Sequence, residues 1–140
     1  MTKSFIQFIF CCLICSTTMS YADDLALSQA LNADVSVSGQ MTADKFQKLI
    51  QQGFKSVVVN RPDNEPGNLI TAHQLRSLSE KSKVSLIYQP VISGQISQLE
   101  VTEFSKYYNS LPKPILLICK SGSRSRSLFN QTKAQGLLNE

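Results

Sequence analysis

Short apolar runs alternate with stretches of helical periodicity from residue 35 to the end of the chain. The runs VVV, LIY and ILLI are continuously apolar, which is typical of strands that helices cover on both faces. Four such strand–helix units fit into fewer than 110 residues. The pattern therefore predicts a single α/β domain, with a mainly parallel central sheet of four to five strands flanked by helices.

The expected strands and helices can be placed by their boundary residues. Strands are expected near residues 35–39, up to residue 60, over residues 84–92 and over residues 114–119. Three helices are expected to follow Thr42, Thr71 and Ser97, because these side chains can accept hydrogen bonds from the first free backbone N–H groups. Glu100 follows Ser97 at the spacing of a capping box. A last helix is expected to begin near residues 123–125.

The first 22 residues have the features of an export signal. Lys3 precedes the apolar stretch FIQFIFCCLIC, and the small residues Ser20 and Ala22 occupy the two positions that a signal peptidase reads. A short membrane anchor is the alternative, but the apolar core is shorter than the ~20 residues of a membrane-spanning helix. We expect cleavage near Ala22, a periplasmic or secreted protein without a stable membrane anchor, a lead-in over residues 23–34 and a domain over residues 35–140.

Removal of this signal would change the cysteine count and the charge. The full chain has four Cys and a net charge of +4, whereas 118 residues with Cys119 alone and a charge of +3 would remain. A single Cys excludes an intramolecular disulfide and a thiolate zinc cluster. His73 is the only His and lacks partners at metal-ligand spacing, so neither metal nor cofactor is expected. The mild charge excess argues against nucleic acid as a partner, and the oligomeric state stays open.

The segment ILLICKSGSRSRS joins the last predicted strand to the last predicted helix. Ligands of open parallel sheets bind beyond the carboxyl ends of the strands, which is where Cys119 is expected. Successive backbone N–H groups in this turn can surround an anion, and the helix N-terminus adds partial positive charge. The alternative is a buried structural Cys before a solvated basic turn. The candidate substrate contacts in the turn are Lys120, Ser121, Gly122 and Ser123.

The same surroundings predict a reactive thiol. The helix N-terminus and the basic side chains of Lys120, Arg124 and Arg126 should lower the pKa of Cys119 and favour the thiolate, which is the nucleophilic form. The planar guanidinium of Arg124 can hold an anion with two parallel donors. We therefore expect Cys119 to act as a nucleophile and Arg124 as a clamp for a small anionic substrate.

The pieces VSGQMTAD, GFKSVVVNRPDNEPGN, PVISGQIS and ICKSGSRS resemble the phosphatase-like domain of the beta-lactamase hydrolase-like family, over residues 35–131. The resemblance implies a fold similar to dual-specificity and tyrosine phosphatases, and the same roles for Cys119 and Arg124. Some members are described as sulfur transferases, and the domain also occurs joined to persulfide-oxidising metallo-β-lactamase-like modules. The resemblance further implies a site rim that includes Asn60, Arg61, Asp63 and Glu65.

The chain departs from the tyrosine-phosphatase pattern HCxxxxxR. Ile118 precedes the Cys, only four residues separate Cys119 from Arg124, and the stretch QPVISGQIS lacks the acid that those phosphatases use on the leaving oxygen. Asp63 or Glu65 could replace this acid only if their Pro/Gly loop folds over the pocket. The shorter spacing resembles single-domain rhodaneses, whose sulfur transfer expels a stable anion without a general acid.

Three functions follow from these observations. The favoured one is sulfane-sulfur transfer from thiosulfate or a persulfide through a persulfide on Cys119. The alternatives are hydrolysis of phosphate monoesters through a thiophosphate on Cys119, and a non-catalytic module that binds anions.

Overall fold

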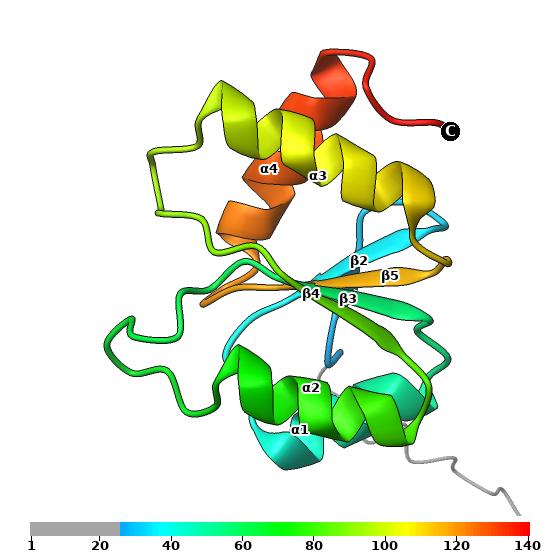
Figure 1. Ribbon diagram of the computed structural model, residues 1–140, viewed down its shortest axis with the longest axis vertical. Coiled ribbons are helices and arrows are strands. Elements are labelled where there is room, and N and C mark those ends of the chain that lie inside the picture. Colours follow the sequence, from blue (N-terminus) through cyan, green and yellow to red (C-terminus); the bar gives the residue numbers. More distant parts are fainter. Residues whose placement is uncertain (1–25) are drawn as a thin grey trace, which may run out of the picture.

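A central sheet lies between two layers of helices in the computed structural model, which describes residues 26–140 (Figure 1). The expected export signal at residues 1–22 lies outside these residues. Among the residues that are described, no helix has both the length and the apolar character needed to cross a bilayer. In chain order the elements are β1 (Gln29–Ala30), β2 (Val35–Ser38), α1 (Ala43–Gln51), β3 (Ser56–Val59), α2 (Ala72–Lys81), β4 (Ser85–Tyr88), α3 (Gln98–Ser110), β5 (Ile115–Ile118) and α4 (Ser123–Ala134).

The five strands have the order β1-β2-β5-β3-β4. The last four of these run parallel, and Ile115 at the start of β5 pairs with Val35 of β2 and Ser56 of β3. Only β1 is antiparallel to its neighbour. The predicted α/β class and mainly parallel sheet are confirmed. Because β5 is central, the residues that follow it lie between the ends of β2 and β3.

The sheet starts before residue 35, where the sequence placed the beginning of the domain. Gln29 and Ala30 pair with β2, while Leu27 and Leu31 each pack against one of the two hydrophobic clusters. A strand of two residues is too short to show a periodic pattern, so it could not be predicted from the sequence. The third expected strand is shorter than predicted, since β4 ends at Tyr88 and residues 89–92 are not part of it.

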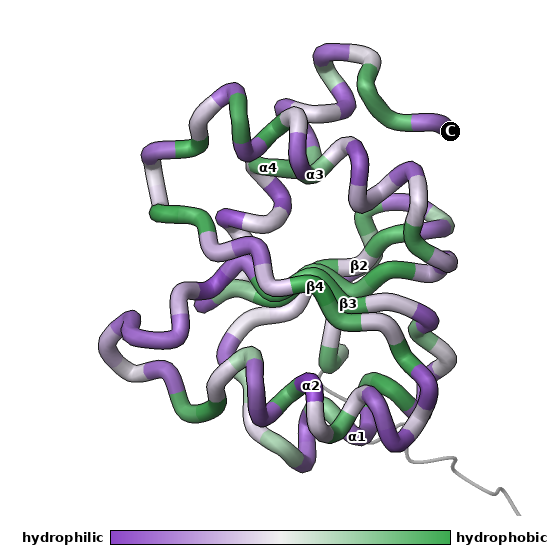
Figure 2. Tube along the Cα trace, viewed as in Figure 1, coloured by the Kyte–Doolittle hydropathy of each residue, from purple (hydrophilic) through white to green (hydrophobic). Residues whose placement is uncertain are grey.

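Alternate side chains of the parallel strands face opposite helix layers, as the pleat requires. Val57 and Val59 pack in the cluster that α1 and α2 cover, whereas Val58 packs in the cluster that α3 and α4 cover. Figure 2 shows hydrophobic residues along the strands between these layers. Burial on both faces is why the strand sequences are apolar without alternation.

The first three predicted N-caps begin their helices. Thr42 accepts a backbone hydrogen bond at the start of α1, and Thr71 and Ser97 each form a capping box at the starts of α2 and α3. The fourth helix differs, because its cap is Gly122 in the left-handed region, with φ of 88° and no side-chain hydrogen bond. The N-terminus of α4 therefore begins directly in the turn that follows Cys119.

Candidate active site

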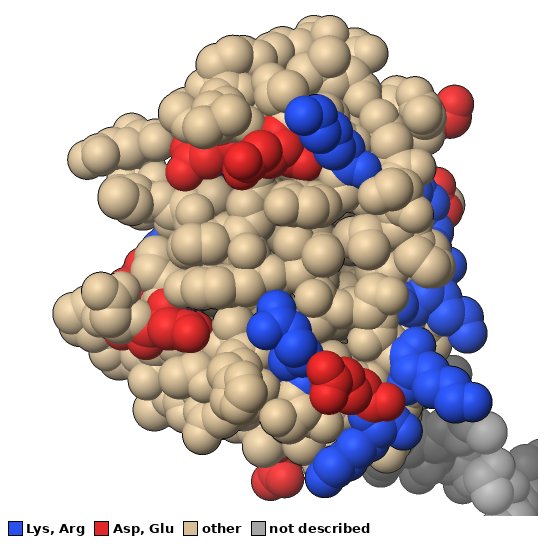
Figure 3. Space-filling model, in the orientation of Figure 1, with Lys and Arg blue, Asp and Glu red and all other residues tan. Residues whose placement is uncertain are grey.

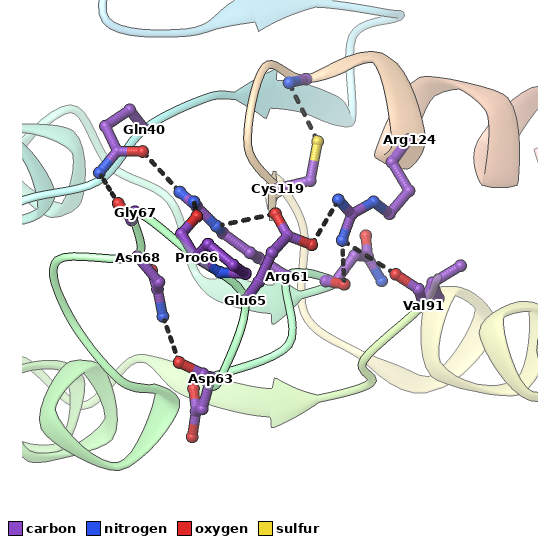
Figure 4. A network of polar contacts seen from close by, with 12 residues as sticks. Gln40, Arg61, Asp63, Glu65, Pro66, Gly67, Asn68, Val91, Cys119 and Arg124 are labelled. Carbon is purple, nitrogen blue, oxygen red and sulfur yellow. Dashed lines mark hydrogen bonds and ion pairs between the residues drawn. The ribbon is translucent and has the colours of Figure 1, made fainter. Parts of the chain in front are cut away.

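Cys119 follows β5 at the carboxyl end of the sheet, the position that the sequence predicted. Its N–H donates to Ser38 O at 3.1 Å, and Asn60 N–H donates to Ile118 O at 2.7 Å, so the ends of β2, β5 and β3 are joined around it. The thiol is free and only 1% exposed. Gly122 N–H donates to Cys119 Sγ at 3.0 Å (Figure 4). The turn therefore directs a backbone donor at the sulfur.

Two glycines allow the turn to take this shape. Gly122 has φ of 88°, and a Cβ there would lie 3.3 Å from Val37 Cγ2. Gly39 forms an isolated bridge with Ser121, and a Cβ on Gly39 would lie 3.0 Å from Lys120 O and 3.1 Å from Ser121 Cα. The segment after β2 thus holds the turn at a distance that only glycine permits. Sequence reasoning missed Gly39, because no local pattern marks a contact between distant segments.

Hydrogen bonds set the acidity of the thiol. Burial raises the pKa of Cys119, but donors from the backbone N–H and hydroxyl of Ser125 and from the N–H groups of Ser121 and Arg124 outweigh it, so the pKa lies below its ordinary value of 9.0. The sequence predicted this direction from basic side chains. The structure instead points to amides of the turn and of the start of α4, together with the Ser125 hydroxyl, which favour the charged form by bonding to it.

Asn60 lies directly after β3 and is completely buried, behind the turn and not on an exposed rim. Its side chain donates to Gln89 O at 3.1 Å and accepts from the Ser125 hydroxyl at 2.8 Å. Val91 N–H donates to its backbone carbonyl at 2.9 Å. Asn60 therefore joins the ends of β3 and β4 to the start of α4.

The Arg124 side chain is 7% exposed, and acceptors of the protein itself occupy most donors of its guanidinium. Its Nη1 donates to Val91 O at 2.9 Å and to Asn60 O at 3.4 Å, and its Nη2 lies 2.8 Å from Glu65 Oε2. Arg124 Nε is buried and has no hydrogen-bond partner within residues 26–140. Arg124, the predicted anion-binding residue, thus retains one free donor at Nε, whereas its two Nη groups bind protein acceptors that fix the position of the side chain.

Glu65 connects Arg124 to a second buried guanidinium. Its Oε1 lies 3.1 Å from Arg61 Nε, and Arg61 also donates to Gln40 Oε1 at 2.5 Å and to Pro66 O at 3.1 Å (Figure 4). Two buried cations share one carboxylate, so this group carries a formal charge of +1. An unbalanced buried cation is costly and favours a thiolate or a bound anion beside it. The sequence placed these residues at one site but did not predict how they pair.

Asp63 is positioned to support α2 and not the thiol. Its carboxylate accepts from Ala72 N–H at 2.7 Å, and its own N–H donates to the Tyr88 hydroxyl at 2.9 Å. Figure 4 shows the Asp63 carboxylate turned away from Cys119. Of the two acids that the sequence offered as proton donors, one therefore caps a helix and the other, Glu65, binds two arginines.

The remaining predicted contacts lie at the surface of the turn. Lys120, Ser121 and Ser123 are exposed, and the Ser121 hydroxyl donates to Ser123 Oγ at 3.2 Å. In Figure 3 the loops that follow β3 and β4 project on either side of a notch at this end of the sheet. His73 lies exposed on α2, and the described part of the chain has no group of three or more His, Cys, Asp or Glu side chains that could hold a metal ion.

Comparison with known sequences matches residues 27–136 to a family described as beta-lactamase hydrolase-like protein, phosphatase-like domain. Beta-lactamase hydrolase-like proteins of Xylella fastidiosa and Agrobacterium fabrum are 25% and 28% identical to this chain over 99 and 103 residues. Each alignment covers 71% of this chain but 23% of the relative. The chain thus spans about a quarter of the length of these curated relatives.

Comparison with solved structures finds phosphatase folds. A candidate phosphatase of Neisseria meningitidis superposes with a TM-score of 0.71 at 26% identity and covers 77% of both chains. The core catalytic domain of a PP-IP phosphatase of S. cerevisiae superposes with a TM-score of 0.61 at 17% identity, over 76% of this chain and 64% of that one. The fold is that of cysteine phosphatases.

Proposed function

The chain belongs to the beta-lactamase hydrolase-like family through its phosphatase-like domain, and we propose that it is an enzyme that transfers sulfane sulfur through a persulfide on Cys119. The observation that carries this proposal is the arrangement of the two candidate acids. Asp63 caps α2, and Glu65 has both carboxylate oxygens on arginines. A reaction that needs no proton donor at the leaving group therefore fits this site better than one that does.

Sulfur transfer meets this condition. The Cys119 thiolate attacks the outer sulfur of thiosulfate, the new S–S bond forms, and the old S–S bond breaks with its electron pair leaving on sulfite. The total charge is the same before and after, and no proton moves. A second nucleophile, such as a thiolate or cyanide, then attacks the outer sulfur of the persulfide and regenerates the thiolate. An alkoxide leaving from a phosphate ester, in contrast, usually needs protonation in the transition state.

The electrostatics of the turn support the first step. The thiolate is favoured by the lowered pKa of Cys119, whose cause is the set of N–H and O–H donors at the start of α4. The formal +1 charge of Arg61, Glu65 and Arg124 favours an anionic substrate. Only four residues separate Cys119 from Arg124, so the turn supplies few amides and suits a small group.

Hydrolysis of phosphate monoesters is the second candidate function. It is favoured by the fold and by the names of the structural neighbours, two of which are described as phosphatases. It requires a proton donor, and Asp63 and Glu65, the two candidates, are occupied by Ala72 N–H and by two arginines. A module that binds anions without turnover is the third candidate.

One parallel assay separates the three. The protein is mixed with thiosulfate and cyanide in one arm and with an aryl phosphate in the other, each beside Cys119→Ser and Arg124→Lys. We expect thiocyanate in the first arm, its loss in Cys119→Ser and a strong reduction in Arg124→Lys, because lysine cannot replace the planar fork. Release of phosphate that requires Cys119 would reverse the ranking. Anion binding without turnover in either arm would favour the module.

We also propose that the chain is exported and acts in the periplasm or outside the cell. The support comes from the apolar stretch and the small residues that end at Ala22. Fractionation of cells that produce the chain with a C-terminal tag tests this proposal. A periplasmic product shortened by about 22 residues is expected, and a full-length product in the cytoplasm would contradict it.

A further inference from the structure

A recess lies beside the Cys119 turn, on the side of the loop that follows β4. It has a volume of about 270 Å³, and one wall is formed by the loop residues Ser93, Gly94 and Ile96. The other wall is formed by four residues of α4, Ser123, Arg124, Ser127 and Gln131. We call this space the α4 recess. Ser123 and Arg124, which begin α4 directly after the Cys119 turn, line this space, so the recess adjoins the turn.

Arg124 gives the α4 recess its charge. The side chain lines the recess, is 92% buried, and has a buried Nε that finds no partner in the described part of the chain. A buried guanidinium donor without an acceptor is rare, because leaving it unpaired costs free energy. The N-terminus of α4, a helix of 12 residues, adds partial positive charge at the same place. Both features select a negatively charged group.

The hydroxyl groups of the wall are also arranged as donors. Gln131 Nε2 donates to Ser127 Oγ at 3.1 Å, and the Ser121 hydroxyl donates to Ser123 Oγ at 3.2 Å. A hydroxyl that accepts one hydrogen bond can donate its own proton more strongly. The O–H groups of Ser123 and Ser127 are therefore available for an acceptor in the recess. Acidic side chains are absent from the residues that line it.

We propose that the α4 recess binds the anionic leaving group of the sulfur donor, and that this group is a small hydrophilic oxyanion such as sulfite. The inference rests on the proposed sulfur transfer. When the Cys119 thiolate takes the outer sulfur of thiosulfate, the breaking S–S bond leaves its electron pair on sulfite, which gains charge as it departs. Arg124 Nε, the two hydroxyls and the α4 N-terminus then stabilise the product as it forms.

The lining also predicts which donors are poor substrates. A phenyl ring in the α4 recess would cover hydroxyl and guanidinium donors without offering them an acceptor, and such a site rejects the mismatched group. Benzenethiosulfonate carries the same transferable sulfur as thiosulfate but releases an aromatic sulfinate. We expect kcat/KM for thiosulfate to exceed that for benzenethiosulfonate by roughly tenfold or more.

The first test measures binding without chemistry. Sulfite is titrated into Cys119→Ser, and amide chemical shifts are followed by NMR. Shifts are expected at Gly94, Ser123 and Ser127, and Ser127→Ala with Gln131→Leu should weaken binding roughly tenfold. Asn130→Ala is the matched control, because Asn130 is an exposed residue of α4 that does not line the recess. Shifts confined to other residues, or equal affinity in the recess variants, would overturn the proposal.

The second test measures transfer in the same variants with Cys119 present. The recess variants should raise KM for thiosulfate and reduce the preference over benzenethiosulfonate, while Asn130→Ala changes neither. If KM and the donor preference are the same in the recess variants as in the unchanged protein, the leaving-group role is refuted while the proposed function is not affected. Sulfite binding in the recess without any Cys119-dependent transfer would instead refute the proposed function. The anion site would be present, but sulfur transfer would not be the reaction.

Discussion

The Ser125 hydroxyl donates a hydrogen bond of 2.8 Å to Asn60 Oδ1, and both residues are completely buried. The same hydroxyl is among the donors that lower the pKa of Cys119. One O–H group carries one proton, so it can serve Asn60 or the thiolate, but not both at once. This pair therefore couples the protonation state of Cys119 to the end of β3.

Replacing Ser125 by alanine should raise the pKa of Cys119, because it removes one donor to the thiolate. The substitution also leaves Asn60 Oδ1 without its partner and should cost roughly 1–3 kcal/mol of stability. The pH dependence of alkylation by iodoacetamide measures the first effect. Ser77→Ala on the exposed face of α2 is the control and should change neither quantity. An unchanged alkylation midpoint in Ser125→Ala would show that the backbone donors suffice.

Stability should depend on pH through the same thiol. The folded protein holds the pKa of Cys119 below 9.0, whereas the unfolded chain titrates near that value. Between the two values the unfolded state binds more protons, so the free energy of unfolding rises with pH across this window. The contribution of Cys119 to stability is therefore lost as the pH falls through the folded-state pKa. Urea unfolding at several pH values measures it, and Cys119→Ser should lack this component. Identical slopes in both proteins would contradict it.

Glu65→Gln should destabilise the protein and disturb Arg124. The substitution leaves two buried guanidinium groups without their shared carboxylate, and breaking such a pair costs roughly 3 kcal/mol. Glu140→Gln is the matched control, since the pair of Glu140 with Lys133 is exposed and should contribute less than about 1 kcal/mol. Chemical unfolding compares them. Equal stability of the two variants would mean that the buried arginines find other acceptors.

Gly39→Ala should distort the turn after Cys119 without harming the rest of the fold to the same degree. Its Cβ would press on the backbone of Lys120 and Ser121, so the amides that face Cys119 must move. We expect slower alkylation of Cys119 at neutral pH. Gly53→Ala serves as the control, because Gly53 also resists a side chain, with φ of 103°, but has nothing within 4 Å of a new Cβ. It should lower stability by roughly 1 kcal/mol and leave alkylation unchanged.

The sequence predicted what depends on neighbouring residues. The caps Thr42, Thr71 and Ser97 bond within their own first turns, and the parallel strands are apolar because helices cover both faces. The end of β5 was likewise marked by the apolar run before Cys119. These features need no knowledge of the strand order.

The rest depends on contacts between distant segments. The close approach of Gly39 to the turn, the hydrogen bond between Arg124 and Val91, and the use of Asp63 as a cap for α2 follow from the strand order and the path of two loops. The family resemblance predicted that Asn60, Arg61 and Glu65 belong to the site, but their burial and pairing could be seen only in the fold.

The central position of β5 has a consequence for how reactivity is interpreted. Its residues pair with β2 on one side and β3 on the other, so its amides should be among the last to exchange with deuterium. Cys119 follows directly on this strand, which opens only when most of the sheet opens. Cys119 itself is 1% exposed, so alkylation under native conditions requires a movement of the turn, and the stable strand before it confines that movement to the turn.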